Sequence, residues 1–191
     1  MSLDEIQLGT ERLLLRAPTV SDADALRAIV ADPRVALTTA SIPHPYPDSG
    51  VLEFIERVRA LAGPDRRNFA ITVSPSGSLI GMVGFVSSDR EAELAYMLSP
   101  EQWGRGYATE AAREVVRFVF GSTRVSAVTA RAMTANPASE NVLRRAGFTC
   151  EGEDDVELPI RGAVCRTSFW RIEREHHDPP IWATGRSDRQ T

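Results

Sequence analysis

The chain has 191 residues, of which 42% are hydrophobic and 25% charged, a composition of globular rather than collagen-like, disordered or membrane-spanning proteins. This length predicts one domain, since domains most often contain about 100 to 150 residues. With 22 basic and 26 acidic residues the net charge is −4, which lacks the basic excess that binding to nucleic-acid phosphates requires. We therefore expect one domain over residues 1–175, a polar, flexible tail over 176–191, and no nucleic-acid or membrane partner.

Every basic residue is arginine, and the chain contains no lysine. This excludes mechanisms that need a lysine, including Schiff-base chemistry and a phosphate-loop lysine. Two cysteines, Cys150 and Cys165, make neither a disulfide framework nor a four-ligand zinc site, and the three histidines are too scattered for a metal centre. We expect no metal and a reducing, cytoplasmic location.

The first part of the chain predicts a strand, two helices and a long loop. Residues 12–16 (RLLLR) form the strand, and 21–31 form a helix with Ser21 as its N-cap. Residues 32–50 contain four prolines and predict a loop, after which apolar residues at helical spacing predict a helix over 51–61.

Three consecutive strands separated by short turns follow, over residues 68–73, 79–87 and 91–98, and predict an antiparallel meander. The remaining segments predict an alternation of helices and strands. They are a helix over 107–120 ended by Gly121, a strand over 125–132, a helix from the cap Asn136 to Arg145 ended by Gly147, and a hairpin of 148–157 and 163–172.

The most informative segment is 98–110 (LSPEQWGRGYATE), where a strand ends, two glycines follow and an amphipathic helix starts. The backbone N–H groups at a helix start have no partner within the helix, and the helix dipole adds positive charge. Glycine lets a phosphate approach the main chain closely. The segment therefore predicts a binding site for a phosphate or pyrophosphate.

Three classes of ligand use such a site. A Walker loop is excluded because it needs a lysine. A dinucleotide fingerprint is a poor match, since Thr109 stands where its third glycine belongs and no carboxylate lies in 122–136 to bind the ribose. The third ligand is the pyrophosphate of coenzyme A.

Four segments in order carry a resemblance to a known family: TERLLLR (10–16), ELAYML (93–98), WGRGYATEA (103–111) and NPASENVLRRAGF (136–148). They resemble the GNAT acyl-CoA N-acetyltransferases, specifically the RimJ/RimL-like branch that includes ribosomal-protein N-terminal acetyltransferases. The resemblance spans roughly residues 10–173. It implies an α/β (α+β) GNAT fold, a mixed and mostly antiparallel central sheet with helices on both faces.

The resemblance also implies acetyl-CoA as co-substrate and assigns the residues that hold it. Backbone N–H groups near Met97 and Leu98 stabilise the oxyanion, Asn136 contacts the pantetheine arm and Arg144 meets the 3′-phosphate. The pyrophosphate lies on the turn formed by Trp103, Gly104, Arg105, Gly106, Tyr107, Ala108 and Thr109.

For the chemistry, the resemblance implies Glu93 as the base that deprotonates the amine through a water. A primary amine is mostly protonated near pH 7, so a base is needed. Ser139 matches a proposed general acid for the departing thiolate. Many relatives have a tyrosine acid four residues later, where this chain has Leu143. A thiol pKa near ~8.5 makes the thiolate a fair leaving group, so Ser139 or a water suffices.

On the acceptor side, the loop that contains His44 and Tyr46 resembles the segment that flanks the acceptor cleft. Five acidic residues within 151–157 form either a solvated hairpin face or a surface that attracts a cationic amine.

We therefore predict an N-acetyltransferase in which a primary amine attacks acetyl-CoA directly, without a covalent acyl-enzyme. The acceptor stays open between a protein N-terminus and a small-molecule amine. A homodimer also stays open, since relatives are often dimers. The alternatives are a non-catalytic acyl-CoA-binding module and a nucleotide-binding module that would bind NADPH.

Overall fold

The computed structural model describes residues 6–176 and is built on one eight-stranded sheet. The strands lie in the order β1-β2-β3-β4-β5-β6-β8-β7, and every described pair is antiparallel except β5 with β6. The strands are β1 (Leu8–Gly9), β2 (Leu13–Arg16), β3 (Arg66–Val73), β4 (Ser78–Ser87), β5 (Glu91–Leu98), β6 (Ala127–Met133), β7 (Thr149–Leu158) and β8 (Ala163–Glu173).

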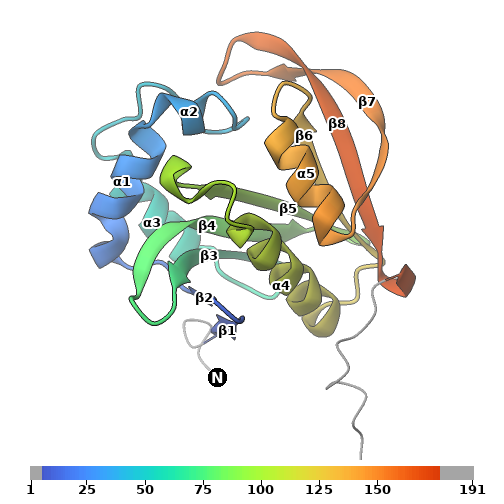
Figure 1. Ribbon diagram of the computed structural model, residues 1–191, viewed down its shortest axis with the longest axis horizontal. Helices are drawn as coiled ribbons and strands as arrows, with labels where there is room; N and C mark the ends of the chain where they lie inside the picture. The colour runs from blue at the N-terminus through green and yellow to red at the C-terminus, as the bar shows by residue number, and fades with distance from the viewer. Residues whose placement is uncertain (1–5, 177–191) are drawn as a thin grey trace, which may run out of the picture.

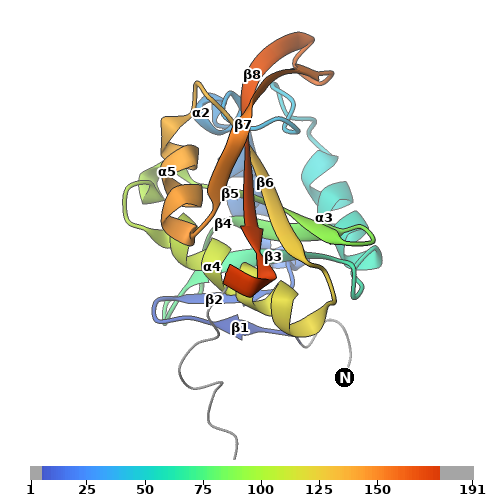
Figure 2. The same cartoon turned by 90° about the vertical axis from the view of Figure 1, so that its right-hand side faces the viewer.

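Helices cover both faces of the sheet (Figures 1 and 2). Helices α1 (Ala23–Ala31) and α3 (Gly50–Ala60) lie on one face, and α4 (Tyr107–Ser122) and α5 (Pro137–Ala146) lie on the other. The short helix α2 (Pro33–Ala36) follows α1, and 3-10 turns occupy Val20–Asp22, Pro100–Gln102 and Arg174–His176. The predicted α/β fold with a mostly antiparallel sheet is confirmed.

The two faces bury separate hydrophobic clusters. The larger cluster lies under α4 and α5, with Val115 and Leu143 fully buried against strand residues such as Phe69. The smaller cluster joins α1 and α3 to β3 and β4 through residues that include Leu26 and Met82. Because side chains alternate between the faces of a strand, the two clusters share the same strands without sharing residues.

Four local predictions differ from the structure. The N-cap at Ser21 is wrong, because the Asp22 carboxylate accepts the Thr19 amide at 2.7 Å and the chain turns from residue 20 onward. The predicted loop 32–50 contains α2. Gly121 does not end its helix, which continues to Ser122. Strand β1 was not predicted; most of the predicted tail 176–191 lies outside the described residues.

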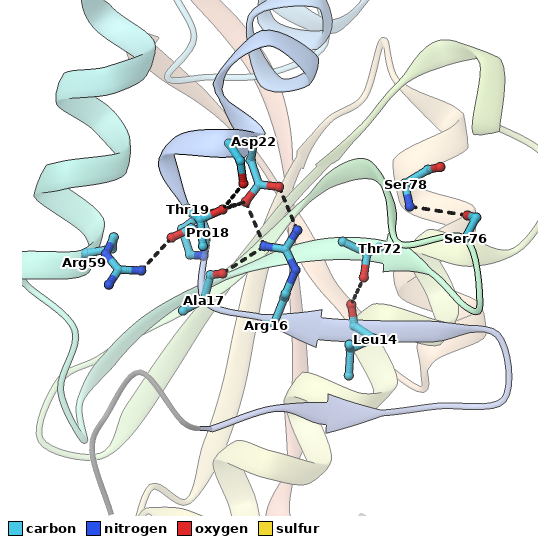
Figure 3. A network of polar contacts seen from close by, with 11 residues as sticks. Leu14, Arg16, Ala17, Pro18, Thr19, Asp22, Arg59, Thr72, Ser76 and Ser78 are labelled. Atoms are coloured by element: carbon cyan, nitrogen blue, oxygen red, sulfur yellow. Dashed lines mark hydrogen bonds and ion pairs between the residues drawn. The ribbon is translucent and has the colours of Figure 1, made fainter.

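One ion pair fixes α1 to the sheet (Figure 3). Arg16 of β2 donates two parallel hydrogen bonds of 2.7 Å to the two carboxylate oxygens of Asp22. Burial alone would raise the pKa of Asp22, but the bonds from Arg16 and Thr19 outweigh it and hold the pKa below its ordinary value. Because α1 begins directly after Asp22, the pair sets where that helix leaves the sheet.

None of the helices within residues 6–176 combines the length and hydropathy needed to cross a bilayer.

Candidate active site

The turn between β5 and α4 depends on two glycines. Gly104 and Gly106 have φ angles of 75° and 82°, in the left-handed region that residues with a Cβ rarely adopt. Gly106 is also the N-cap of α4. These angles bend the chain so that the strand passes into the helix within a few residues.

The backbone amides of this turn have no acceptor in the described structure. The first helical hydrogen bond of α4 runs from the Glu110 amide to the Gly106 carbonyl at 3.0 Å, and none of the N–H groups of residues 104–109 donates a bond to described residues. Six consecutive donors at the start of a sixteen-residue helix are the arrangement that binds phosphate oxygens. The segment predicted to bind pyrophosphate therefore presents a row of free backbone donors in the described structure.

Two residues of the turn between β1 and β2, Thr10 and Arg12, hold the glycine turn in place through Glu110 of α4. Arg12 donates through its backbone N–H (2.9 Å) and its Nε (2.7 Å) to the carboxylate of Glu110, and Thr10 Oγ1 donates to the same carboxylate at 2.6 Å. Arg12 Nη1 also donates to the Arg105 carbonyl at 3.0 Å, and its guanidinium lies 4.6 Å from the Tyr107 ring centroid. We name this set, Thr10, Arg12 and Glu110, the clamp.

The clamp has two consequences for the turn. It draws the Arg105 carbonyl toward a guanidinium, so that this negative dipole end is neutralised where an anion would bind. Burial alone would raise the pKa of Glu110, yet the bonds from Thr10 and Arg12 lower it, so the carboxylate stays ionised and keeps Arg12 in place.

Trp103, the first residue of the predicted pyrophosphate segment, packs back on β5. Its indole Nε1 donates to the Leu98 carbonyl at 3.0 Å, and the residue is 44% exposed. The side chain therefore ties the turn to the end of β5.

Strands β5 and β6 separate beside this turn. Their parallel pairing ends at Leu94 with Ala130, although β5 continues to Leu98 and β6 to Met133. The Ser99 amide donates to the Ile80 carbonyl of β4 at 2.8 Å, and N–H groups alternate between the two edges of a strand. The Met97 amide is therefore directed toward β4, and the Leu98 amide faces the gap between β5 and β6. Of the two predicted oxyanion donors, Leu98 has the required direction.

Tyr96 and Ser139 form a hydroxyl pair across this gap. Tyr96 Oη lies 2.8 Å from Ser139 Oγ and 3.2 Å from the Ser139 carbonyl oxygen. Burial raises the pKa of Tyr96 to about 12, against a smaller lowering by the bond to Ser139. The tyrosine therefore keeps its proton at neutral pH and has one to donate to Ser139.

Asn136 places Ser139 by capping α5. Its side-chain oxygen accepts the Ser139 amide at 3.2 Å, and its Nδ2 donates to the Thr38 carbonyl at 3.4 Å. The predicted cap is confirmed, and the side chain links α5 to the loop after α2.

A cavity of about 620 Å³ opens at the gap between β5 and β6. Tyr96 and Ser139 line it from the α4–α5 side of the sheet, whereas Glu93 and Met97 lie on the opposite face, because successive side chains of β5 alternate. The cavity thus reaches both faces of the sheet where the strands part.

The part of the cavity under α1 and α3 has an apolar wall, which we call the apolar end. Its residues belong to the smaller hydrophobic cluster or pack against it. They are Leu26, Val30, Ile42, Tyr46, Phe54, Met82 and Met97.

Comparison with known proteins agrees with this geometry. The Acetyltransferase (GNAT) domain family matches residues 12–149, and the chain is 33% identical over 150 residues to the uncharacterized N-acetyltransferase p20 of Bacillus licheniformis, covering 76% of this chain and 83% of the relative. The chain belongs to the GNAT acetyltransferase family. The predicted family is confirmed.

Two solved structures with ligands share the fold. Spermidine N-acetyltransferase from Vibrio cholerae in complex with CoA and spermine has a TM-score of 0.74 and 20% identity, over 87% of this chain and 98% of that one. The ribosomal L7/L12 alpha-N-protein acetyltransferase RimL in complex with coenzyme A has a TM-score of 0.77 and 16% identity, over 90% and 100%. The second belongs to the branch that the sequence resembles.

Glu93, the predicted base, lines the cavity but is exposed rather than buried. Its Oε1 accepts from Arg131 of β6, with 2.7 Å to Nη2 and 2.8 Å to Nε. The sequence did not reveal Arg131 as a partner of Glu93, because the pairing of β5 with β6 was not evident from it. Arg131 and Glu93 therefore line the cavity as an ion pair.

The two predicted acceptor residues are placed differently. Tyr46 lines the cavity, and its hydroxyl donates to the Gly50 carbonyl at 3.4 Å. A Cβ at Gly50 would lie 2.9 Å from the Tyr46 ring, so the glycine allows the ring to pack on the start of α3. His44 is exposed and does not line the cavity.

Arg144, predicted to meet the 3′-phosphate, lies in the last turn of α5. It donates to Asn141 Oδ1 at 2.6 Å, and its guanidinium lies 5.5 Å from the Trp170 ring centroid. The described residues contain no group of three or more histidine, cysteine or acidic side chains that would hold a metal ion.

The acidic run 151–157 lies on β7, and its carboxylates do not line the cavity. Arg166 of β8 pairs with Glu153 at 3.3 Å and with Asp155 at 3.6 Å. Within the described structure, the run is therefore a solvated hairpin face that is partly neutralised by arginine.

Proposed function

We propose that this protein transfers an acetyl group from acetyl-CoA to a primary amine by direct attack within a ternary complex. The observation that carries the proposal is the row of six amides at residues 104–109 that donate no hydrogen bond to any residue the structure describes. They offer donors for both phosphates of the CoA pyrophosphate beside the cavity in which the reaction takes place. Membership of the GNAT family and the CoA held by two structural neighbours support the same ligand.

In this proposal the amine enters from the face that carries Glu93. Its ammonium form loses a proton to Glu93 through a water, because only the neutral amine has a lone pair for attack. Arg131 holds the carboxylate in one orientation and leaves its second oxygen, Oε2, without a bond to described residues. That oxygen is the one that accepts the proton.

The amine nitrogen then bonds to the thioester carbonyl carbon, and the carbonyl oxygen becomes an oxyanion. The Leu98 amide, on the open edge of β5, donates to that oxygen. Collapse breaks the carbon–sulfur bond, and the CoA thiolate takes a proton from Ser139 Oγ. Tyr96, 2.8 Å from Ser139 Oγ, replaces that proton. The attacking nitrogen loses its second ammonium proton as the amide forms, and this proton returns to Tyr96 through water.

No cysteine takes part in this scheme. Cys150 is exposed on β7 and Cys165 lies on β8, and neither lines the cavity. Both thiols are unpaired, which fits a reducing compartment such as the cytoplasm.

The test is a bisubstrate assay with acetyl-CoA and primary amines, in which CoA thiol release and the mass of the amine are followed together. We expect one thiol for each acetylated amine and intersecting double-reciprocal plots, as a ternary complex requires. Parallel plots, or an acetylated enzyme formed without amine, would contradict direct attack. Acetyl-CoA binding with no thiol release for any amine would instead indicate an acyl-CoA-binding module.

A further inference from the structure

We infer that the acceptor is a small primary amine carried on an apolar body, and that the tip of the β7–β8 hairpin encloses it. This inference rests on the proposed function, because it assigns the contents of the same cavity. Three observations carry it: the apolar end, the balance of charge, and the attachment of the hairpin tip.

The apolar end is a partly filled hydrophobic cluster. Leu26 and Met82 are buried in the cluster and also line the cavity, while Tyr46 and Phe54 are only partly buried. Such side chains gain free energy when an apolar group of the ligand removes their remaining surface from water. An acceptor that placed only charged or hydrated groups here would lose that gain and its own hydration.

The charge on the cavity wall does not favour a polycation. The charged residues that line it carry equal numbers of negative and positive charges. They are two carboxylates, Glu53 and Glu93, and two guanidinium groups, Arg57 and Arg131. Glu93 is already paired with Arg131, and the acidic run of β7 lies outside the lining. A ligand with several ammonium groups would therefore meet one unpaired carboxylate at most among the described lining residues.

The hairpin tip forms one side of the cavity and is bonded to the segment after α2. Arg161, in the turn of the hairpin, donates through Nε (2.9 Å) and Nη2 (2.6 Å) to the Thr39 carbonyl, and Nη2 also donates to the Ala36 carbonyl at the end of α2. Leu158 and Ile160 of the same tip line the cavity. Figure 1 places this tip beside α2, on the same side of the molecule.

The bonds that hold the segment after α2 limit the space for the acceptor. Asn136 Nδ2 donates to the Thr38 carbonyl, so the segment after α2 is held by α5 as well as by Arg161. Loop, hairpin tip and sheet thus border one cavity, and its volume of about 620 Å³, which the acceptor shares with the reacting end of acetyl-CoA, is in the range of sites for small molecules.

The experiment compares four acceptors at saturating acetyl-CoA: 2-phenylethylamine, ethylamine, spermidine and a hexapeptide with a free N-terminal serine. We expect kcat/KM for 2-phenylethylamine to exceed that for ethylamine by about ten- to a hundredfold, the factor that burial of one phenyl-sized group gives. Spermidine and the peptide should fall below 2-phenylethylamine. A preference for spermidine or the peptide, or equal values for the two monoamines, overturns the inference.

The variant Arg161→Gln tests the enclosure, with Arg166→Gln as its matched control on the same hairpin. We expect Arg161→Gln to raise the KM for 2-phenylethylamine about tenfold and to leave the KM for acetyl-CoA unchanged, while Arg166→Gln changes neither. Thermal unfolding of both variants checks that they fold. An unchanged amine KM in folded Arg161→Gln contradicts the enclosing role of the hairpin.

Calorimetry with acetyl-CoA alone separates this inference from the proposed function. Absence of acetyl-CoA binding, or binding without turnover of any of the four amines, refutes the acetyltransferase proposal. Binding with turnover of the wrong acceptor refutes only the acceptor class.

Discussion

The two parts of the proposed active site, the glycine turn before α4 and the apolar end of the cavity, are built in different ways. The proposed pyrophosphate site is one contiguous segment whose donors are backbone amides, shaped by two glycines with positive φ. The apolar end instead gathers side chains from α1, α3, β4, β5 and the loop before α3. A backbone site fixes one ligand group and tolerates side-chain change, whereas a side-chain site changes its specificity with each substitution. Chains of this fold can thus share a cofactor and differ in acceptor.

The largest effect is expected at the hydroxyl pair of Tyr96 and Ser139, which lines the cavity. Ser139→Ala should lower kcat about a hundredfold, because a positioned acid contributes about that factor, and should leave the KM for acetyl-CoA nearly unchanged. Tyr96→Phe should lower kcat about tenfold and shift the pH profile, since it acts through Ser139. The control is Ser122→Ala, which removes an exposed hydroxyl bonded to the Phe118 carbonyl. Wild-type kcat in Ser139→Ala would exclude the acid role.

A side chain at the N-cap of α4 should break the backbone site. Gly106→Val places a β-branched residue at a φ of 82°, which should weaken acetyl-CoA binding about ten- to thirtyfold in calorimetry. Gly121→Ala is the matched control, because a Cβ there meets nothing within 4 Å and its φ is not positive. That variant should bind normally and be more stable by about 1 kcal/mol. Equal binding by both variants would contradict a site shaped by glycine geometry.

Loss of the Arg12 side chain from the clamp should weaken acetyl-CoA binding less than Gly106→Val does. Arg12→Gln removes the bond to the Arg105 carbonyl and should raise the KM for acetyl-CoA about fivefold, with kcat nearly unchanged. Arg27→Gln serves as control, because among residues 6–176 the ion pair of Arg27 is an exposed one with Asp24 of the same helix. A fall in kcat without a change in KM would place Arg12 in a role other than holding the turn.

The smallest effect on turnover is expected at the ion pair that anchors α1. Asp22→Asn should leave kcat/KM within about twofold but lower the free energy of unfolding by about 2 kcal/mol, because Arg16 loses its carboxylate. Since the pKa of Asp22 is held below its ordinary 3.8, its contribution is fully present above that pH and is lost as the pH falls further. Urea unfolding of both proteins from pH 7 to pH 3 should show the difference shrinking at acid pH. A constant difference would argue against ionised Asp22 as the cause.

Features encoded over a few residues could be predicted from the sequence. The glycine turn before α4, the Asn136 cap and the three-strand meander each depend on neighbours within about ten residues, and each is present. Helix α2 also had a local signal, Asp32 as N-cap before Pro33, but the prolines at 43, 45 and 47 made the whole segment resemble a loop.

Contacts between distant segments could not be predicted in this way. Tyr96 lies 43 residues from Ser139, and its role depends on which face of β5 it occupies and where α5 docks. Arg161 reaches Thr39 across 122 residues, and Arg131 reaches Glu93 through the single parallel strand pair described. Sheet order and register decide these pairs, and neither follows from local periodicity.

The most direct test of the central claim is thermal unfolding with acetyl-CoA, CoA or NADPH added separately. A ligand at about 100 times its dissociation constant stabilises a protein by about 2.7 kcal/mol, which is readily measured. If the amides of residues 104–109 bind the CoA pyrophosphate, both CoA species raise the midpoint and NADPH does not, and Gly106→Val loses most of the shift. No shift with saturating acetyl-CoA and CoA would contradict the account, and a shift with NADPH alone would indicate a nucleotide-binding module instead.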